Sequence, residues 1–265
     1  MDNAQHGARP PEGYDPSAFP AFAVTVDVVV LAVVDDDLRV ALIRRGGDPY
    51  RGMWALPGGF KRPDETLDAA AARELDEEAG LTAVRLAQFG AYGDPGRDPR
   101  MHVVTVGYYA AVPEASWLRA GTDADDARWA SVADVLDGQL RLAFDHACIV
   151  ADARARLADD LDRTDAALAL VSTEFTVPQL RRAYEAVWRL DLPPGERAGF
   201  GLDRRNFRRQ LEAAPGPFLV ETGRTTSDRN AETGSEVSPG RPAAFHRATD
   251  AWQETSPVRR PRALR

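Results

Sequence analysis

Residues 59–81 read GFKRPDETLDAAAARELDEEAGL, and this stretch decides the fold of the first half of the chain. The run from Thr66 to Ala79 predicts a helix that ends at Gly80, since glycine is common directly after helices. On that helix three glutamates share one face, being three or four positions apart: Glu74, Glu77 and Glu78. Like charges at this spacing repel, which costs stability unless a cation lies between them. Hard divalent ions such as Mg²⁺ take oxygen ligands, so this face is a candidate magnesium site.

Nine fixed points make the stretch specific: Gly59, Glu65, Arg73, Glu74, Leu75, Glu77, Glu78, Gly80 and Leu81. Two or three clustered glutamates alone would favour an ordinary solvated acidic helix. The nine spacings, however, match the signature G-x5-E-x7-R-E-U-x-E-E-x-G-U of the Nudix hydrolases, where U is an apolar residue. The chain resembles this family over about residues 21–160. The resemblance implies an α+β fold, a Nudix α/β/α sandwich with the signature as a loop–helix–loop.

The resemblance also implies a role for each position. Mg²⁺ or Mn²⁺ would be the cofactor, and one glutamate would help to activate water. The implied metal ligands are Glu74, Glu77, Glu78 and the carbonyl of Gly59. The implied structural supports of the motif are Glu65, Arg73 and Gly80. Enzymes of this family cut a nucleoside diphosphate linked to another moiety at the pyrophosphate, and the signature does not choose the moiety.

Arginines outside the signature are candidates for binding substrate phosphates. The run DPGRDPR at 94–100 resembles a segment of Nudix domains that handle ADP-ribose, although a turn with exposed arginines is the alternative. A second pair of arginines, Arg44 and Arg45, lies at the end of a predicted strand, where it either approaches phosphate or is exposed at the surface. The predicted substrate-binding residues are Arg44, Arg45, Arg97 and Arg100. Where some family members carry a further catalytic glutamate, this chain has only aspartates: Asp123, Asp125 and Asp126.

Composition divides the chain into four parts. We expect a flexible leader at 1–19, the Nudix domain at 20–163, a smaller domain at 164–248 and a disordered tail rich in arginine and proline at 249–265. In the Nudix domain the sequence predicts strands at 24–34, 38–44, 84–92 and 102–112, and helices at 132–137 and 145–161. His146 and Cys148 are expected at a buried helix start capped by Asp145, rather than in nucleophilic chemistry.

The smaller domain carries four arginines on one short predicted helix, 202–213, with Phe207 and Leu211 on its buried side. A solvated arginine face is the alternative interpretation. The order of a helix at 176–188, the arginine helix and a hairpin at 218–221 and 243–247 resembles the winged helix of Nudix-related transcriptional regulators, which control NAD metabolism with ADP-ribose as effector. The implied contacts to double-stranded DNA come from Arg204, Arg205, Arg208, Arg209, Arg224 and Arg241. The segment 192–201 is longer than such a domain leads us to expect.

Charge divides the chain in a similar way. Residues 1–170 hold 17 basic and 29 acidic residues, a net charge of -12, whereas residues 171–265 hold 16 and 12, a net charge of +4, and the two sum to -8. This contrast favours two domains with different partners. The chain has one cysteine and no apolar run long enough for a signal peptide or a membrane span. We therefore expect a cytoplasmic protein without a membrane partner. A homodimer is expected as well, because DNA-binding dimers commonly read two half-sites about one helical turn apart.

Two classes of function stay open. The first is a transcriptional regulator whose Nudix domain binds and hydrolyses ADP-ribose or a related nucleoside diphosphate derivative. The second is a plain Mg²⁺-dependent Nudix pyrophosphohydrolase whose C-terminal domain serves dimerisation. The intact glutamate set favours retained hydrolysis, and the arginine helix favours DNA binding.

Overall fold

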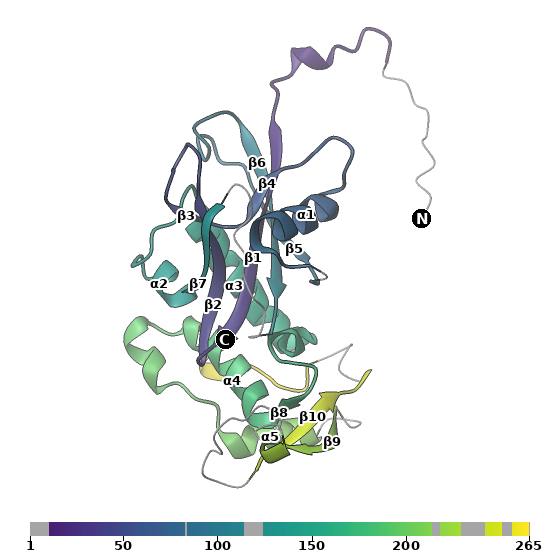
Figure 1. Ribbon diagram of the computed structural model, residues 1–265, viewed down its shortest axis with the longest axis vertical. Helices are drawn as coiled ribbons and strands as arrows, with labels where there is room; N and C mark the ends of the chain where they lie inside the picture. The colour runs from purple at the N-terminus through teal and green to yellow at the C-terminus, as the bar shows by residue number, and fades with distance from the viewer. Residues whose placement is uncertain are drawn as a thin grey trace.

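The computed structural model describes residues 11–82, 84–113, 124–213, 218–228, 242–250 and 256–264. It has two parts: a large sheet flanked by helices and, below it, a smaller domain of helices and short strands (Figure 1). The first ten residues of the expected leader, Asp123 and Arg241 lie outside the described residues. Among the described helices, none has the length and apolar character needed to cross a membrane.

The large part is built on a seven-stranded sheet with the main order β3-β2-β1-β6-β5, to which β4 adds beside β1 and β7 beside β2. Its strands are β1 (Ala23–Val34), β2 (Asp37–Arg45), β3 (Trp54–Ala55), β4 (Gly58–Phe60), β5 (Ala87–Tyr92), β6 (Val103–Ala111) and β7 (Ala124–Ser131). The predicted β1–β2 hairpin is confirmed, and Asp35 and Asp36 form its turn with φ of 51° and 62°. Strands β3, β4 and β7 were not predicted from the sequence. The first two are only 2 and 3 residues long and carry no alternating pattern.

Helices cover both faces of this sheet. Alternate residues of β1 point to opposite sides, so Val28 and Val30 pack in one buried cluster with helix α1 (Leu67–Ala79). Val29 and Leu31 pack in the other cluster with α2 (Val132–Leu136) and α3 (His146–Arg163). Burial on both faces explains the unbroken apolar run at residues 28–32 of β1. The predicted α/β/α sandwich is confirmed.

The signature helix α1 begins and ends where its sequence predicts. The hydroxyl of Thr66 accepts a hydrogen bond from the backbone N–H of Ala69 at 3.1 Å, which satisfies one donor of the first turn. Gly80 ends the helix in the left-handed conformation, with φ of 66°.

The smaller domain has two main helices and a three-stranded sheet of order β8-β10-β9. Its elements are η2 (Ala166–Leu170), β8 (Phe175–Thr176), α4 (Val177–Trp188), η3 (Arg189–Asp191), η4 (Pro194–Gly199), α5 (Arg204–Ala213), β9 (Leu219–Thr225) and β10 (Ala244–Ala248). A full capping box between Thr176 and Gln179 starts α4. The unexpectedly long segment 192–201 forms the 3-10 helix η4, which Arg197 ties to Asp137 after α2 at 2.7 Å.

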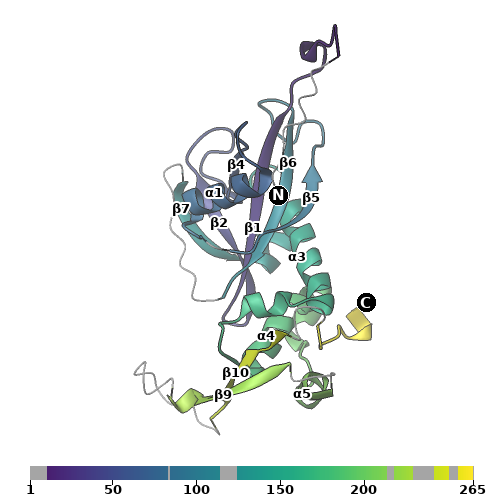
Figure 2. The ribbon, with the colours of Figure 1, turned by 90° about the vertical axis from the view of Figure 1, so that its right-hand side faces the viewer.

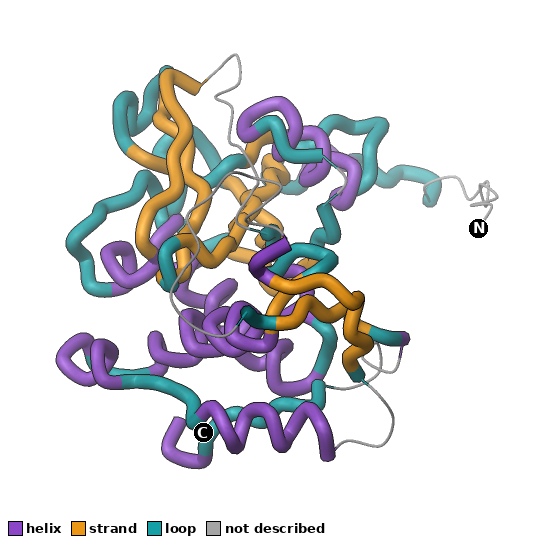
Figure 3. Tube along the Cα trace, turned by 60° about the horizontal axis from the view of Figure 1, so that its bottom comes forward, coloured by secondary structure: helices purple, strands orange, loops and turns teal. Residues whose placement is uncertain are grey.

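One buried cluster spans both parts of the chain. It contains Val29 and Leu31 of the large sheet, Leu157 of α3, and Trp188 of α4. In Figure 2, α3 runs from the large sheet toward α4, and Figure 3 shows helices packed together beside the strands. The two domains therefore pack through a continuous apolar core.

Ion pairs surround this shared core. Arginines of the basic C-terminal half pair with aspartates of the acidic N-terminal half in Arg182–Asp36 (2.9 Å), Arg189–Asp37 (3.2 Å) and Arg260–Asp159 (3.0 Å). The charge contrast seen in the sequence thus serves, in part, to join the two domains. Pairs of this kind contribute orientation more than stability.

Residues 256–264, within the expected tail, pack against the smaller domain and α3. Ser256 and Val258 are each 1% exposed, and the Ser256 hydroxyl lies 3.0 Å from the Tyr184 hydroxyl of α4. Residues 262–264 form the short 3-10 helix η6 (Arg262–Leu264). Two of the tail arginines contact α3: Arg260 pairs with Asp159 at 3.0 Å, and Arg259 donates to the backbone carbonyl of Asp162.

Candidate functional site

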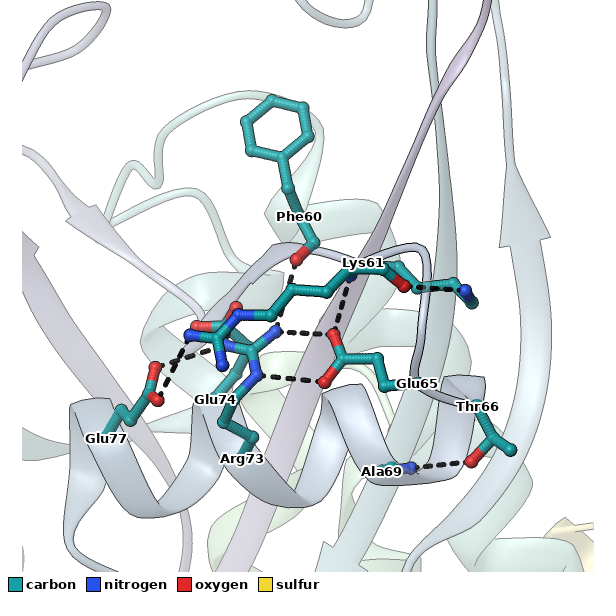
Figure 4. A network of polar contacts seen from close by, with 9 residues as sticks. Phe60, Lys61, Glu65, Thr66, Ala69, Arg73, Glu74 and Glu77 are labelled. Atoms are coloured by element: carbon teal, nitrogen blue, oxygen red, sulfur yellow. Dashed lines mark hydrogen bonds and ion pairs between the residues drawn. The ribbon is translucent and has the colours of Figure 1, made fainter.

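Arg73 organises the signature loop–helix–loop (Figure 4). Its guanidinium donates to both oxygens of Glu65, from Nε to Oε2 at 3.0 Å and from Nη2 to Oε1 at 2.7 Å. The same guanidinium donates to Glu74 at 2.7 Å, to Glu77 at 3.1 Å and to the Phe60 carbonyl at 3.2 Å. These contacts hold the strand β4, the loop and the helix α1 in one arrangement, which is the supporting role expected of Arg73 and Glu65.

Two glycines of β4 lie against the carboxylates of α1. The backbone N–H of Gly58 donates to Glu78 Oε2 at 2.8 Å. A Cβ atom on Gly59 would lie closer than 3.0 Å to the Glu74 carboxylate, and one on Gly58 would meet the carbonyl of Val26 equally closely. Burial raises the pKa of Glu74 against the lowering effect of Arg73. Only glycine lets β4 approach both β1 and these carboxylates.

The three glutamates have two sets of partners. Glu74 and Glu77 both accept hydrogen bonds from Arg73, and Glu77 also faces Arg62 at 3.5 Å, whereas Glu78 accepts one from the Gly58 backbone. In the described part of the chain, no three acidic, histidine or cysteine side chains converge as a metal site. Carboxylate and carbonyl oxygens are nevertheless the donors that Mg²⁺ takes, and Gly59 lies directly against the Glu74 carboxylate. The donor set fits a hard divalent ion once Glu77 and Glu78 turn from their present partners.

A cavity of about 560 Å³ opens beside the signature. Its wall includes Gly58, Gly59 and Glu78 together with three of the four predicted substrate arginines, Arg45, Arg97 and Arg100. The volume lies within the range of about 300–1,000 Å³ typical of small-ligand sites. Glu78 of the signature and these arginines therefore share one cavity.

Arg45 and Arg100 both lie over one aromatic ring of this cavity. Their guanidinium carbons are 4.8 Å and 5.9 Å from the ring centroid of Phe144. Arg100 pairs with Asp98 at 2.7 Å and lies 5.4 Å from the ring of Phe60. Burial and then the charge of Arg100 lower the pKa of Arg45. Two close cations on apolar rings favour an anionic ligand.

The other two predicted substrate arginines are placed differently. Arg97 lines the cavity, but it is 5% exposed, its Nε and Nη2 donate to Asp145 at 2.8 Å and 2.6 Å, and Asp27 lies 3.5 Å away. Although burial opposes its charge, Asp145 raises the pKa of Arg97. Arg44 is not among the residues that line the cavity and donates to the Gly52 carbonyl at 3.1 Å.

His146 is buried at the start of α3, as expected, whereas Cys148 is exposed and Asp145 does not cap the helix with its side chain. The carboxylate of Asp145 is directed to Arg97 instead. His146 Nδ1 accepts the backbone N–H of Leu56 at 2.9 Å, and burial lowers its pKa despite Asp27. A neutral ring with this acceptor carries its proton on Nε2, 3.6 Å from Asp27.

Sequence reasoning missed several residues of the cavity wall, among them Asp27, Phe60, Asp98 and Phe144. A signal was present for Asp27, because a carboxylate that interrupts the apolar run of β1 needs a partner. Phe60 ends β4 and Phe144 lies in the turn before α3, and only the fold brings both to the cavity.

The exposed face of α5 holds the four predicted DNA-binding arginines. Phe207 and Leu211 point inward, 1% and 7% exposed. The arginines are all exposed: Arg204, Arg205, Arg208 and Arg209. Arg208 pairs with Glu212 at 2.8 Å, and Arg209 donates to Asn206 at 2.6 Å. Asp203 accepts the N–H of Asn206 at 2.7 Å, so it caps this helix as expected.

Arg224, predicted to contact DNA from the hairpin, is less exposed than the arginines of α5. Arg224 on β9 lies 3.1 Å from Glu174, which also pairs with Arg247 of β10. Arg241 lies outside the described residues.

Comparison with known protein families identifies the class of protein to which this chain belongs. The NUDIX domain model matches residues 24–153, and the NrtR DNA-binding winged helix domain model matches residues 167–247. The chain is 32% identical over 200 residues to the ADPR responsive transcriptional repressor NtrR of Acinetobacter baylyi, which covers 75% of this chain and 75% of that protein. The chain therefore belongs to the family of regulators that join a Nudix domain to an NrtR winged helix.

Solved structures agree with this assignment. The chain superposes on Shewanella oneidensis NrtR complexed with a 27mer DNA with a TM-score of 0.69 at 28% identity, covering 88% of this chain and 98% of that one. The ADP-ribose pyrophosphatase of Methanocaldococcus jannaschii is 38% identical over 125 residues, 47% of this chain and 71% of that enzyme. The predicted two-domain fold is confirmed.

Proposed function

We propose that this protein is a transcriptional repressor that binds ADP-ribose, or a closely related nucleoside diphosphate derivative, in the Nudix cavity and binds operator DNA with the winged helix. The observation that carries the proposal is the presence of both sites in one chain, an arginine-lined cavity beside the signature and an exposed arginine face on α5. The regulated genes are proposed to serve NAD metabolism, by analogy with the regulators of this family.

The cavity suits the diphosphate of such a ligand. Arg45 and Arg100 supply two cations on the ring of Phe144, and a diphosphate relieves their mutual repulsion. A relative supports the choice of nucleotide: the Nudix domain of S. oneidensis NrtR complexed with ADP ribose is 37% identical, covers 55% of this chain and 95% of that one, and superposes with a TM-score of 0.50.

The arginine face suits DNA. Guanidinium groups make two-pronged contacts with phosphates and with guanine edges, so α5 is proposed as the helix that enters the major groove. Arg204 and Arg205 stand at its first turn, where recognition helices contact bases, and Arg224 would approach the backbone from the hairpin. A homodimer in the cytoplasm, reading a pseudo-palindromic operator, completes this proposal.

Hydrolysis is the second candidate activity, favoured by the complete set of signature glutamates. When bound, Mg²⁺ would polarise a phosphoryl oxygen and lower the pKa of a water. Glu74, Glu77, Glu78 and the Gly59 carbonyl would hold the ion, while Arg45 and Arg100 would orient the diphosphate. A plain pyrophosphohydrolase with a dimerising C-terminal domain remains the alternative to the regulator.

One binding experiment separates these candidates. A fluorescent duplex carrying the DNA upstream of the protein's own gene is titrated with the full chain, with and without ADP-ribose. The regulator predicts binding that an unlabelled random duplex does not displace and that ADP-ribose weakens. Binding that depends on neither sequence nor nucleotide would support the plain hydrolase.

A further inference from the structure

We infer that helix α3 couples the Nudix cavity to the winged-helix domain, with Asp145 as a positioning residue at its start and Arg154 as a positioning residue near its middle. The inference rests on the proposed function and assigns its regulation to named contacts. Helix α3 has 18 residues, the longest helix in the described ranges, and spans about 27 Å at 1.5 Å per residue.

The start of α3 is fastened to the cavity wall. Asp145, directly before the helix, accepts two hydrogen bonds from Arg97, and His146, its first residue, accepts one from the backbone of Leu56. Arg97, Leu56 and His146 all line the cavity. An anion that enters therefore competes with Asp145 for Arg97 and repels the Asp145 carboxylate.

The second half of α3 is fastened to the smaller domain. Arg154 donates to the carbonyl of Leu190 at 3.0 Å and pairs with Asp191, both in η3 directly after α4. The Trp188 indole N–H donates to the carbonyl of Ala158 at 3.1 Å. Trp188 is 0% and Ala158 1% exposed, so water does not separate the two helices here.

The end of α4 is in turn connected to the arginine helix. Glu185 accepts the backbone N–H of Leu202, just before α5, at 2.6 Å. The rings of Tyr184 and Phe207 pack edge to face with centroids 5.7 Å apart. A shift of α3 against η3 therefore reaches α5 through side chains in direct contact, without crossing solvent.

The packing of α3 makes it move as one body. Ile149, Val150, Ala153 and Leu157 are each 0% exposed in the core that spans both domains. Close-packed interiors have low compressibility, so a displacement at one end is passed along rather than absorbed. Coupling by this route is reciprocal: DNA that favours one position of α3 must change ADP-ribose affinity by the same factor.

Two arginines of α3 offer a matched test. Arg154 reaches the smaller domain, whereas Arg156, two residues on, pairs at 2.9 Å with Asp160 of the same helix. We compare R154Q and R156Q by the ratio of DNA dissociation constants with and without saturating ADP-ribose, using the duplex described above and the full chain. Allosteric ratios are commonly about five-fold or more, so the parent should show a ratio of that size.

The expected result is a ratio below about two-fold in R154Q and the parent ratio in R156Q, with the affinity for each single ligand nearly unchanged. An R154Q variant that keeps the parent ratio overturns the inference. So does an equal reduction of the ratio in both variants, because that would reflect general weakening of the helix. A parent that fails to bind the duplex at all counts against the proposed function itself.

Two further variants test the coupling independently, in case R154Q does not fold. Trp188→Phe keeps an aromatic ring but removes the N–H that donates to Ala158, and Asp145→Asn removes the charge at the cavity end. Both should lower the ratio while circular dichroism and the thermal midpoint stay close to the parent. If both fold and keep the full ratio, α3 is not the connection.

Discussion

Arg73 and Glu65 form a two-pronged ion pair across the signature loop, with N–O distances of 3.0 Å and 2.7 Å. The hydrogen bonds from Arg73, with one from the Arg62 backbone, lower the pKa of Glu65 from 4.5 to about 2. A carboxylate whose pKa is depressed on folding stabilises the native state above its unfolded pKa. That stabilisation is lost as the pH falls through the pKa that the group has in the folded state.

The first prediction follows from the lowered pKa of Glu65. Between pH 4.5 and 2 the parent should lose stability to urea more steeply than Glu65→Gln, because only the parent must protonate this paired carboxylate. Asp64→Asn, at an exposed neighbouring position, is the control and should follow the parent. Parallel curves for the parent and Glu65→Gln would contradict the assigned role.

The second prediction concerns the metal. Replacing Glu77 and Glu78 together with glutamine should keep the fold but abolish Mg²⁺-dependent release of AMP from ADP-ribose, since amides lack the charge that holds a hard cation. The control is Asp76→Asn, exposed on the same helix. Product is measured by chromatography, and Mn²⁺ binding by calorimetry. A double variant as active as the parent would place the metal elsewhere.

The third prediction separates two adjacent arginines. Arg45 lines the cavity and donates to the carbonyl of Pro49, whereas Arg44 donates to that of Gly52 without lining the cavity. Each thus supports the same loop, but only Arg45→Ala should weaken ADP-ribose binding. A hydrogen bond to a charged group is worth about 1.5–3 kcal/mol, so its removal should raise the dissociation constant roughly ten-fold or more. Calorimetry that finds equal weakening in both variants would assign both effects to the loop.

The fourth prediction concerns DNA. Replacing Arg204 and Arg208 with alanine should lower the slope of log affinity against log salt by about 0.9 for each phosphate that the variant no longer neutralises. If a replaced arginine contacts a base, its loss should instead weaken DNA binding by about 1–3 kcal/mol and relax the sequence preference at that position. Arg85→Ala removes an 82% exposed arginine of the Nudix domain and serves as control. Unchanged slopes in the α5 variant would mean that its arginines form a solvated face.

The signature, the long strands and the two main helices of the smaller domain were predictable because each carries a local pattern. Thr66 and Gly80 delimit α1 by their own chemistry, and Phe207 and Leu211 fix the inner side of α5 by their spacing. The two-residue strand β3 was not predictable, because pairing with β2 defines it rather than its own sequence.

The cavity was only partly predictable for a related reason. Arg45 and Arg100 were found as cations near a motif, but whether an arginine meets a ligand or a carboxylate depends on distant residues. Arg97 meets Asp145, 48 positions away, and the Arg154–Asp191 pair spans 37. Such pairs depend on how whole helices and strands pack, and no local sequence pattern predicts them.

The close fit of Gly58 and Gly59 limits how this family branch can diversify. A side chain at either position would clash with the backbone of β1 or with the carboxylate of Glu74. Single substitutions of these two glycines, which form the floor of the cavity, are therefore not tolerated. The rim is not under that restriction, because Phe60 is 45% exposed and its side chain has room to be exchanged. Descendants that come to recognise another nucleotide would therefore differ at the rim and keep the same floor.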